Sequence, residues 1–382
     1  MKFLCIIFLT FIGIESYAQY GLNIYHDVTL TFMEIHPDAR IGGFGEVDVI
    51  SSPFYSNTGL YRNPALLSKN KKESEASVSY MPYLGNNEND LNFIGINGYF
   101  AFSKKNAIGL NYTLFNQGEL TLTDVNGIYF GKDRIYDFYL QAVFNHSFNQ
   151  SISTGLSVKY IHSKYVLPYQ SIKGNLNTFA IDFGFNFDDQ YNLSETSLLN
   201  TSLGLAISNF GPKVNYNDYD EAFLPTKLLL GLFINPDLYI NENLRFNIEL
   251  GYQAEKFLVP TEPLYDFEGN IISGYNSDVT AFTAIYQSFY DAPGGFEEEI
   301  DEIMHKFGSE FRLEIGSKSY IALRHGRIIE HESKGNRKYQ TFGLGGGYKR
   351  LMLDFKIVGY SAFEELNVIW SLSAGYKFNF DF

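Results

Sequence analysis

The side chains best suited to chemistry in this chain are its histidines, which occupy positions 26, 36, 146, 162, 305, 325 and 331. Imidazole groups bind zinc when a second histidine or a cysteine lies at a short, fixed spacing. No pair here has that spacing, and His325 and His331 flank the end of a predicted hairpin. We therefore expect no metal site.

An acidic run, Glu297-Glu298-Glu299-Ile300-Asp301-Glu302, is a second candidate for cation binding. Calcium loops alternate Asp or Asn with other residues and contain a glycine at the turn. The run lacks that pattern, so the favoured interpretation is a solvated helix face.

Glycine-rich stretches are candidates for phosphate binding. Gly42-Gly43-Phe44-Gly45 is not a dinucleotide fingerprint, and no strand–helix–strand unit follows it. The glycines between 343 and 347 fall inside a predicted strand, where close backbone packing or a bend is the simpler explanation. Gly316-Ser317 lacks the residues that flank a catalytic serine. With no catalytic constellation, we expect a protein that is not an enzyme and that uses no cofactor.

Strands are the elements that position most residues of this chain. Apolar and polar residues alternate from Leu244 to Gln253, which is the period of a strand with two different faces. The same pattern recurs and predicts fourteen strands of about ten residues or more, the length that a tilted membrane strand needs. The predicted strands are 74–83, 91–103, 106–117, 135–148, 151–164, 176–188, 198–209, 226–235, 243–255, 308–316, 319–329, 338–349, 351–360 and 367–381.

The connections between these strands alternate between tight and long. The tight ones are at 104–105, 149–150, 317–318 and 350, two of intermediate length span 189–197 and 236–242, and the long ones span 118–134, 165–175, 210–225 and 256–307. Outer-membrane barrels have short periplasmic turns and longer extracellular loops. We therefore predict an all-β, 14-stranded antiparallel transmembrane β-barrel with both termini in the periplasm.

The longest connection, 256–307, is predicted to be a partly helical extracellular loop. Residues 278–290 place Val279, Phe282, Tyr286 and Phe289 on one side of a helix. After Gly294-Gly295, further apolar residues recur at helical spacing. Four of them form our candidate partner-docking surface, with packing against the barrel rim as the alternative: Phe296, Ile300, Ile303 and Met304.

The N-terminus has the features of a secretory signal peptide. Lys2 precedes an apolar run from Phe3 to Ile14, and Ser16-Tyr17-Ala18 ends it, so we expect cleavage after Ala18. The one cysteine, Cys5, falls within this leader, which excludes disulfides and thiolate metal sites from residues 19–382. The net charge of −14 argues against nucleic-acid binding.

The stretch from His36 to Ser68 differs from the strands that follow. Its glycines require unusual backbone angles or close approach, and Asn63 before Pro64 is held out of the helical region. We predict that residues 19–73 hold a hatch inside the lumen of a barrel formed by 74–382. Charged residues on the polar strand faces would point into that lumen, and Arg40 or Asp38 would pair with a wall residue of opposite sign; a solvated pore wall is the alternative. These wall residues are Arg245, Glu249, Asp354, Lys356, Lys377 and Asp381.

The hatch carries a family resemblance. Pro37-Asp38-Ala39-Arg40-x-Gly42-Gly43-x-Gly45-Glu46, followed by Asn63-Pro64-Ala65, resembles the PorV family of Bacteroidetes outer-membrane proteins. That family belongs to the FadL-like superfamily of fourteen-stranded barrels with an N-terminal hatch. Leu66 stands where PorV proper has a basic residue, and the loop 256–307 is unusually long and acidic.

The resemblance implies a role in the type IX secretion system. PorV-like proteins are outer-membrane shuttles that bind the C-terminal signal domains of secreted cargo and pass them from the translocon to the attachment machinery, without covalent chemistry. The implied partners are outer-membrane lipid and either cargo domains or translocon and attachment proteins. A FadL-like passive channel for hydrophobic small molecules remains the alternative, and the sequence does not separate the two.

Overall fold

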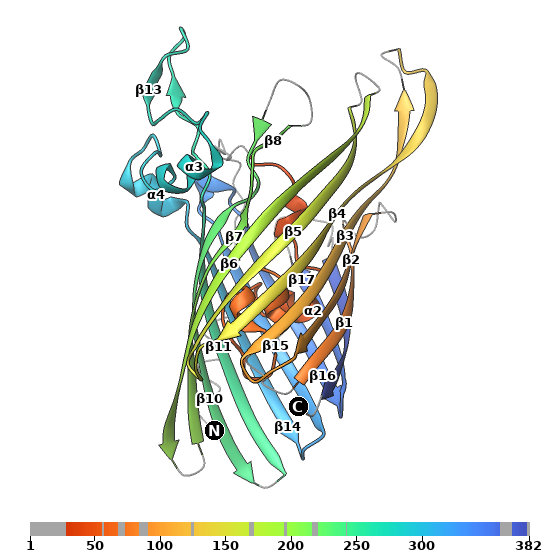
Figure 1. Cartoon of the computed structure of the whole chain (residues 1–382), viewed down its shortest axis with the longest axis vertical. Helices are drawn as coiled ribbons and strands as arrows, with labels where there is room; N and C mark the ends of the chain where they lie inside the picture. Colours follow the sequence, from red (N-terminus) through yellow and green to blue (C-terminus); the bar gives the residue numbers. More distant parts are fainter. Residues whose placement is uncertain are drawn as a thin grey trace.

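A computed structural model describes residues 28–55, 57–67, 73–83, 91–123, 126–167, 172–194, 197–215, 221–241, 243–359 and 369–379. Fourteen antiparallel strands close into a barrel (Figure 1), and the first strand pairs with the last, Glu75 lying opposite Lys377. Except at this seam, each barrel strand pairs with the barrel strands before and after it in the sequence. The predicted fold class and strand number are confirmed.

The barrel strands have the following bounds: β1 Glu73–Pro82, β2 Leu91–Ala101, β3 Asn106–Thr123, β4 Tyr129–Ser147, β5 Ile152–Leu167, β6 Ile172–Ser194, β7 Ser197–Phe210, β10 Lys227–Asn241, β11 Leu244–Phe257, β14 Met304–Ile315, β15 Ser319–Ile329, β16 Lys338–Tyr348, β17 Leu351–Gly359 and β18 Ile369–Asn379. Two short hairpins stand outside the barrel wall: β8 Val214–Asn215 with β9 Glu221–Ala222, and β12 Leu264–Tyr265 with β13 Ile271–Ser273.

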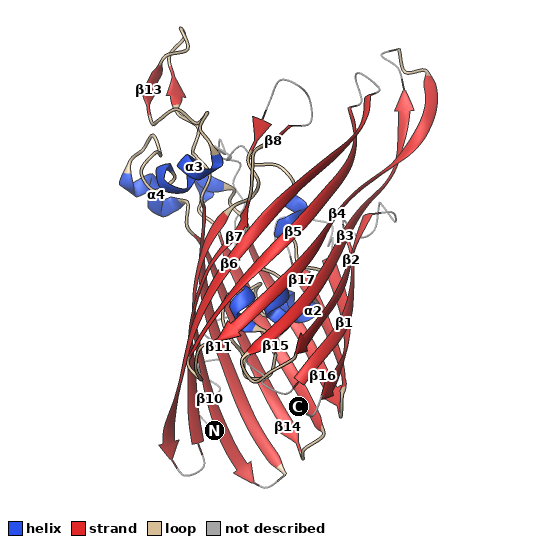
Figure 2. Ribbon diagram, in the orientation of Figure 1, coloured by secondary structure: helices blue, strands red, loops and turns tan. Residues whose placement is uncertain are grey.

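Several strands run farther than their sequence pattern predicts. The predicted loops 118–134 and 165–175 are largely strand, because β3 continues to Thr123 and β6 begins at Ile172. The intermediate turns are also shorter, since β6 ends at Ser194 and β10 at Asn241. Alternation fades where a strand leaves the apolar layer and water wets both faces, so the pattern underestimates strand length there. Figure 2 shows the long strands rising above the barrel at the end that carries the long loops.

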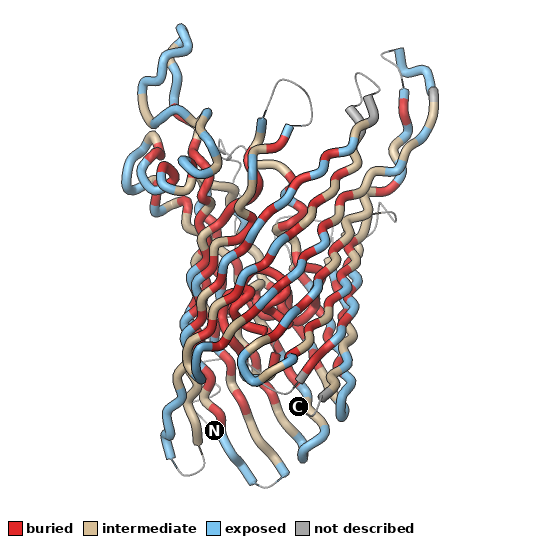
Figure 3. The backbone as a smooth tube through the Cα atoms, in the orientation of Figure 1, coloured by how far each residue is buried: buried red, intermediate tan, exposed pale blue. Residues whose placement is uncertain are grey.

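The two faces of the wall differ as a membrane barrel requires. On β11, Glu249 and Gln253 are fully buried toward the lumen, whereas Leu250 on the opposite face is 46% exposed. The same alternation of buried and exposed residues runs along most strands (Figure 3). Among the described residues, no helix has the length and apolar character needed to cross a membrane.

The long loop (residues 258–303) contains two short helices, α3 Ala281–Gln287 and α4 Phe296–Asp301. The helix predicted over 278–290 is present but shorter, and Thr280 caps it by accepting a hydrogen bond from Thr283 N. The second predicted helix ends at Asp301, because the chain enters β14 at Met304. Met304 is therefore a strand residue, and it pairs with Glu255 of β11. The helical spacing that grouped Met304 with Phe296 was misleading.

The segment before β1 lies inside the barrel and contains four short helical elements: η1 Thr31–Glu34, α2 Ala39–Gly43, η2 Asn57–Leu60 and η3 Pro64–Leu66. Its first described residue, Val28, forms a bridge with Phe223 just before β10. Phe223 is at the long-loop end, so the described segment starts there and runs down through the lumen toward β1. Residue 1 and residue 382 are outside the described residues, so the predicted periplasmic position of the termini stays a prediction.

Candidate functional site: the hatch, the lumen wall and the long loop

The Pro37-Asp38-Ala39-Arg40 motif forms the start of helix α2. The Asp38 carboxylate accepts hydrogen bonds from Arg40 N (3.0 Å) and Ile41 N (2.9 Å), as a helix N-cap does. Ala39 N donates to Ser373 Oγ of β18 at 2.8 Å. The motif therefore shapes one turn of helix and fastens it to the wall.

Glycines from both the hatch and the wall allow their backbones to meet. A Cβ atom on Gly43 would lie 3.0 Å from Gly343 Cα, and one on Gly45 would collide with Phe307 O. Gly45 also has a φ of +71°, a backbone conformation that glycine adopts without the steric cost that a Cβ atom brings. Ten lumen-facing wall glycines, which we call the glycine belt, lie against the hatch in this way: Gly95, Gly109, Gly155, Gly184, Gly204, Gly231, Gly251, Gly308, Gly326 and Gly343.

The glycine belt is continuous over much of the wall, because several of its members are partners across neighbouring strands. Gly155 pairs with Gly184, and Gly204 pairs with Gly231. Gly308 of β14 pairs with glycines on both sides, in β11 and β15. Along the belt the wall contributes no side chain of its own, so the backbone and side chains of the hatch can approach the wall backbone closely.

The Asn63-Pro64-Ala65 motif forms a second fixed point. Asn63 Oδ1 accepts from Ala65 N (3.1 Å), while its Nδ2 donates to Val49 O (2.6 Å). On the wall, Ser153 Oγ donates a hydrogen bond to Ala65 O at 2.8 Å. Asn63 consequently joins two parts of the hatch, and these bonds require a side chain that has both an acceptor and a donor.

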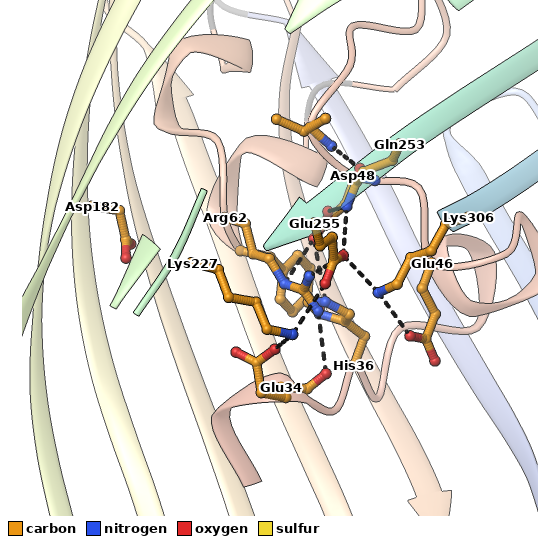
Figure 4. Close-up of polar contacts among 12 residues, drawn as sticks. Glu34, His36, Glu46, Asp48, Arg62, Asp182, Lys227, Gln253, Glu255 and Lys306 are labelled. Carbon is orange, nitrogen blue, oxygen red and sulfur yellow. Dashed lines mark hydrogen bonds and ion pairs between the residues drawn. The ribbon is translucent and has the colours of Figure 1, made fainter. Parts of the chain in front are cut away.

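Charged side chains link the hatch to the wall in a buried network (Figure 4). Arg62 Nη1 lies 2.6 Å from Glu255 Oε1 of β11, and Lys306 Nζ lies 2.7 Å from the same oxygen. Lys227 pairs with Glu34 of the hatch and, at 3.0 Å, with Glu255. Buried charges are expensive unless paired, and here they are paired across the hatch–wall boundary.

The predicted partner of Arg40 is present. Its guanidinium lies 3.7 Å from Glu249 and 4.0 Å from Glu310, both on the wall. Asp354 and Lys377 also face the lumen, where they bond Arg324 Nη1 and Phe54 O. Arg245 instead pairs with Asp237 on the neighbouring strand, and Asp381 lies outside the described residues.

Sequence reasoning missed the centre of this network, namely Arg62, Lys227, Glu255 and Lys306. Glu255 lies on the same face of β11 as Glu249, so the alternation of the sequence could have predicted that it faces the lumen. Arg62 precedes Asn63-Pro64 in a stretch with no periodic pattern, so only the folded hatch reveals its role. Among the described residues, no group of three or more His, Cys, Asp and Glu side chains is arranged to hold a metal ion.

The long loop exposes large apolar side chains instead of burying them. On α3, Phe282 and Tyr286 are 63% and 60% exposed, and Phe289 follows at 49%. Three of the four residues of the predicted apolar face are therefore exposed, whereas Val279 packs against the buried cluster of Phe223, Val259 and Ala284. Val28 of the hatch packs against the same cluster. The hatch and the long loop are thus in direct contact.

The acidic helix α4 is clamped to the barrel rim. Lys256 of β11 bonds Glu299 (2.8 Å) and Glu302, and Lys334 bonds Glu302 (2.9 Å) and Glu298 (2.5 Å). The acidic face that the sequence predicts to be solvated is so only in part, since Glu297 is exposed whereas Glu299 and Glu302 are buried.

The four residues of the predicted docking surface do not lie together. Phe296 and Ile300 are exposed on α4, at 78% and 49%. Ile303 is half-buried after the helix, and Met304 is buried in β14. Only the first two are exposed and remain available to a partner.

Comparison with known proteins identifies one family. Residues 24–264 match the family model described as type IX secretion system protein PorV. No curated protein sequence matches the chain. Similar solved structures include the Pseudomonas putida toluene transporter TodX (10% identity, 95% of this chain and 100% of that one, TM-score 0.45) and a Pseudomonas aeruginosa FadL homologue (9%, 90% and 98%, 0.43). The Ralstonia pickettii toluene transporter TbuX is another (10%, 90% and 98%, 0.41).

Proposed function

The chain belongs to the PorV family of type IX secretion system outer-membrane proteins, and on that premise we propose that it binds a protein partner through its extracellular loops. The partner is the signal domain of secreted cargo, or a translocon or attachment protein of the same system. The role is binding and transfer, without covalent chemistry.

The observation that carries this proposal is the exposed aromatic surface of the long loop. Soluble and extracellular surfaces rarely leave large apolar side chains exposed together unless a partner covers them. Here Phe282, Tyr286 and Phe296 are all more than half exposed, while the helices that bear them are held by buried contacts and ion pairs. A surface that is held in place before binding loses less entropy when a partner docks.

The alternative role, a passive channel for hydrophobic molecules, is less well supported. The hatch rests on the glycine belt and is joined to the wall by buried ion pairs. The cavity that Arg40, Phe44 and Phe233 line has a volume of about 10 Å³, which is room for one water molecule. A hydrophobic ligand passing this point would have to displace the hatch.

The test is a partner-capture experiment in native outer membranes. Tagged protein carrying Phe282→Asp and Tyr286→Asp is compared with wild type and with Ile128→Asp, a control at an equally exposed apolar residue of the β3–β4 hairpin (65%). Cargo with its signal domain, or the translocon barrel, should be recovered with wild type and the control and be lost with the double variant. Equal recovery from all three, or lipid alone from wild type, would overturn the proposal.

A further inference from the structure

The outer face of β14, β15 and β16 carries an ordered group of basic side chains at its long-loop end. Strand register places His305 opposite Ile329, and Ile329 opposite Lys338. One row lower, Phe307 lies opposite Arg327, and Arg327 opposite Gln340. Directly opposed residues on a sheet have Cβ atoms roughly 5 Å apart, so these basic groups share one compact patch. We call His305, His325, Arg327 and Lys338 the basic patch.

No carboxylate balances the basic patch from the same surface. No Asp or Glu points outward from the described residues of β11, β14, β15, β16 and β17. Every acidic residue of these strands occupies an alternate position whose side chain faces the lumen. Glu255, Glu310 and Asp354 are examples, and all are buried in the lumen. Arg327 and Lys338 form no ion pair with a described carboxylate.

The acidic helix above the patch does not neutralise it either. The carboxylates of α4 that face the barrel are held by Lys256 and Lys334, and Asp301 lies 3.5 Å from His331. Arg337, next to Lys338 in the sequence, pairs with Glu330 at 2.8 Å. The positive groups of the basic patch therefore remain available to a ligand from outside.

The opposite side of the barrel provides a contrast within the same molecule. At the long-loop end of β3–β5, Lys132 pairs with Glu119 at 2.6 Å, and Lys164 pairs with Asp133 at 2.7 Å. These two lysines of the β3–β5 side are thus paired with acidic neighbours, whereas Arg327 and Lys338 of the basic patch form no ion pair with a described carboxylate.

The surface below the basic patch is wholly apolar. Phe342 lies opposite His325, and the next row holds Leu323 and Leu344; these three apolar side chains are all more than half exposed. His325 is held in place by Gln340 Oε1 at 3.2 Å and packs on the Phe342 ring at 5.1 Å. This surface can therefore bind an anionic group at the basic patch and a hydrocarbon chain along the apolar residues below it.

We propose that the basic patch binds the phosphate groups of a lipid of the outer leaflet, whose acyl chains lie along Leu323, Phe342 and Leu344. Long loops mark the extracellular end of such barrels, so the patch lies at the outer-leaflet interface. Arg327 presents a planar fork that suits phosphate, and Lys338 adds a second positive charge. The ligand therefore combines a phosphorylated head with apolar chains.

Native mass spectrometry of the full-length protein in neutral detergent tests this proposal, with diphosphorylated lipid A as the probe and its fully dephosphorylated form as the comparison. Removing two interfacial charges, each worth about 1 kcal/mol, should weaken binding of the phosphorylated probe about thirtyfold in Arg327→Gln/Lys338→Gln. The control Lys132→Gln/Lys164→Gln should bind it as wild type does. Retained heat-modifiable migration on gels verifies that the variants are folded barrels.

Two results would overturn the assignment. The first is equal affinity of wild type for the phosphorylated and the dephosphorylated lipid, which would leave only acyl-chain contact. The second is equal loss of affinity in the basic-patch variant and the β3–β5 control, which would mean that charge anywhere on the rim suffices. If Arg327→Gln/Lys338→Gln fails to fold, the single variant Lys338→Gln should still show about a fivefold loss.

Discussion

Arg62 of the hatch and Glu255 of β11 form a buried ion pair, with Nη1 and Oε1 2.6 Å apart. Because Lys227 and Lys306 approach the same carboxylate, one wall residue gathers positive charges from the hatch and from two further strands. The pair therefore lies at the centre of one of the buried ion-pair networks that join the hatch to the barrel wall.

Replacing Arg62 with methionine should lower the free energy of unfolding by about 3 kcal/mol, the lower end of the range for breaking a buried pair, because two cations remain at Glu255. Urea unfolding in detergent measures this loss. The control Lys132→Met removes an exposed pair with Glu119, which solvent screens, and should change the free energy of unfolding far less. Similar losses in the two variants would contradict the buried network.

A methyl group on the glycine belt should disturb the seat of the hatch. In Gly204→Ala the new Cβ collides with Val49 O, so either the hatch moves or the wall distorts, at a cost of about 1–3 kcal/mol. We expect ion conductance in planar bilayers to rise above that of wild type. The matched control is Gly98→Ala, whose Cβ would lie 3.7 Å from its nearest neighbour, Glu75 O. If Gly204→Ala shows the conductance and the stability of wild type, the hatch does not pack closely against the wall at this position.

Helix α4 should detach when its clamp is removed. Lys256→Met leaves Glu299 and Glu302 without one of their cations, and both carboxylates then favour water over burial. Limited proteolysis should cut the long loop near α4 faster in this variant than in wild type, with the barrel fragment unchanged. Arg337→Met, which removes a neighbouring rim pair with Glu330, is the control and should leave the cleavage of α4 unaltered.

The packing of the long loop should depend on pH through Asp291. Burial, and then the charge of Glu299, raise the pKa of Asp291 to about 7 from an ordinary value of 3.8. A carboxyl with a raised pKa binds its proton more tightly in the folded loop, so the folded loop loses stability as the pH rises from about 4 to about 7 and stays level above.

Hydrogen exchange, corrected for intrinsic rates, measures this effect between pH 5.5 and pH 8. Residues 258–303 of wild type should be better protected at the lower pH. In Asp291→Asn the difference should shrink, since the charge of residue 291 no longer changes; Thr261 N, which donates to Asp291 Oδ2 at 3.3 Å, keeps an acceptor. An undiminished pH dependence in that variant would assign the effect to Glu299, Glu302 or the lysines that contact them.

Alternation predicted the barrel well because lipid and lumen impose opposite demands on successive residues. All fourteen strands were found, and Glu249 was correctly turned inward. The same rule fails where those demands end: β3 and β6 continue past the membrane, where both faces are wet. Strand number was thus readable from the sequence, and strand length was not.

The loop and the hatch needed the folded structure for a different reason. Amphipathic spacing showed that Phe282 and Tyr286 share a face, but not that this face points away from the barrel. Met304 fitted a helical pattern and still joined a strand, because pairing with Glu255 outweighs local preference. Likewise, nothing local to Arg62 indicates a partner 193 residues away.

The course of the hatch also sets an order of events during biogenesis. The described chain begins at Val28 beside the long loop, descends through the lumen and turns into β1, whose partner at the seam is the last strand. A polypeptide seated this closely cannot be threaded through a finished ring. We therefore expect the hatch to be in place before the barrel closes, and the pairing of β1 with β18, the strand pair of greatest sequence separation, to form last.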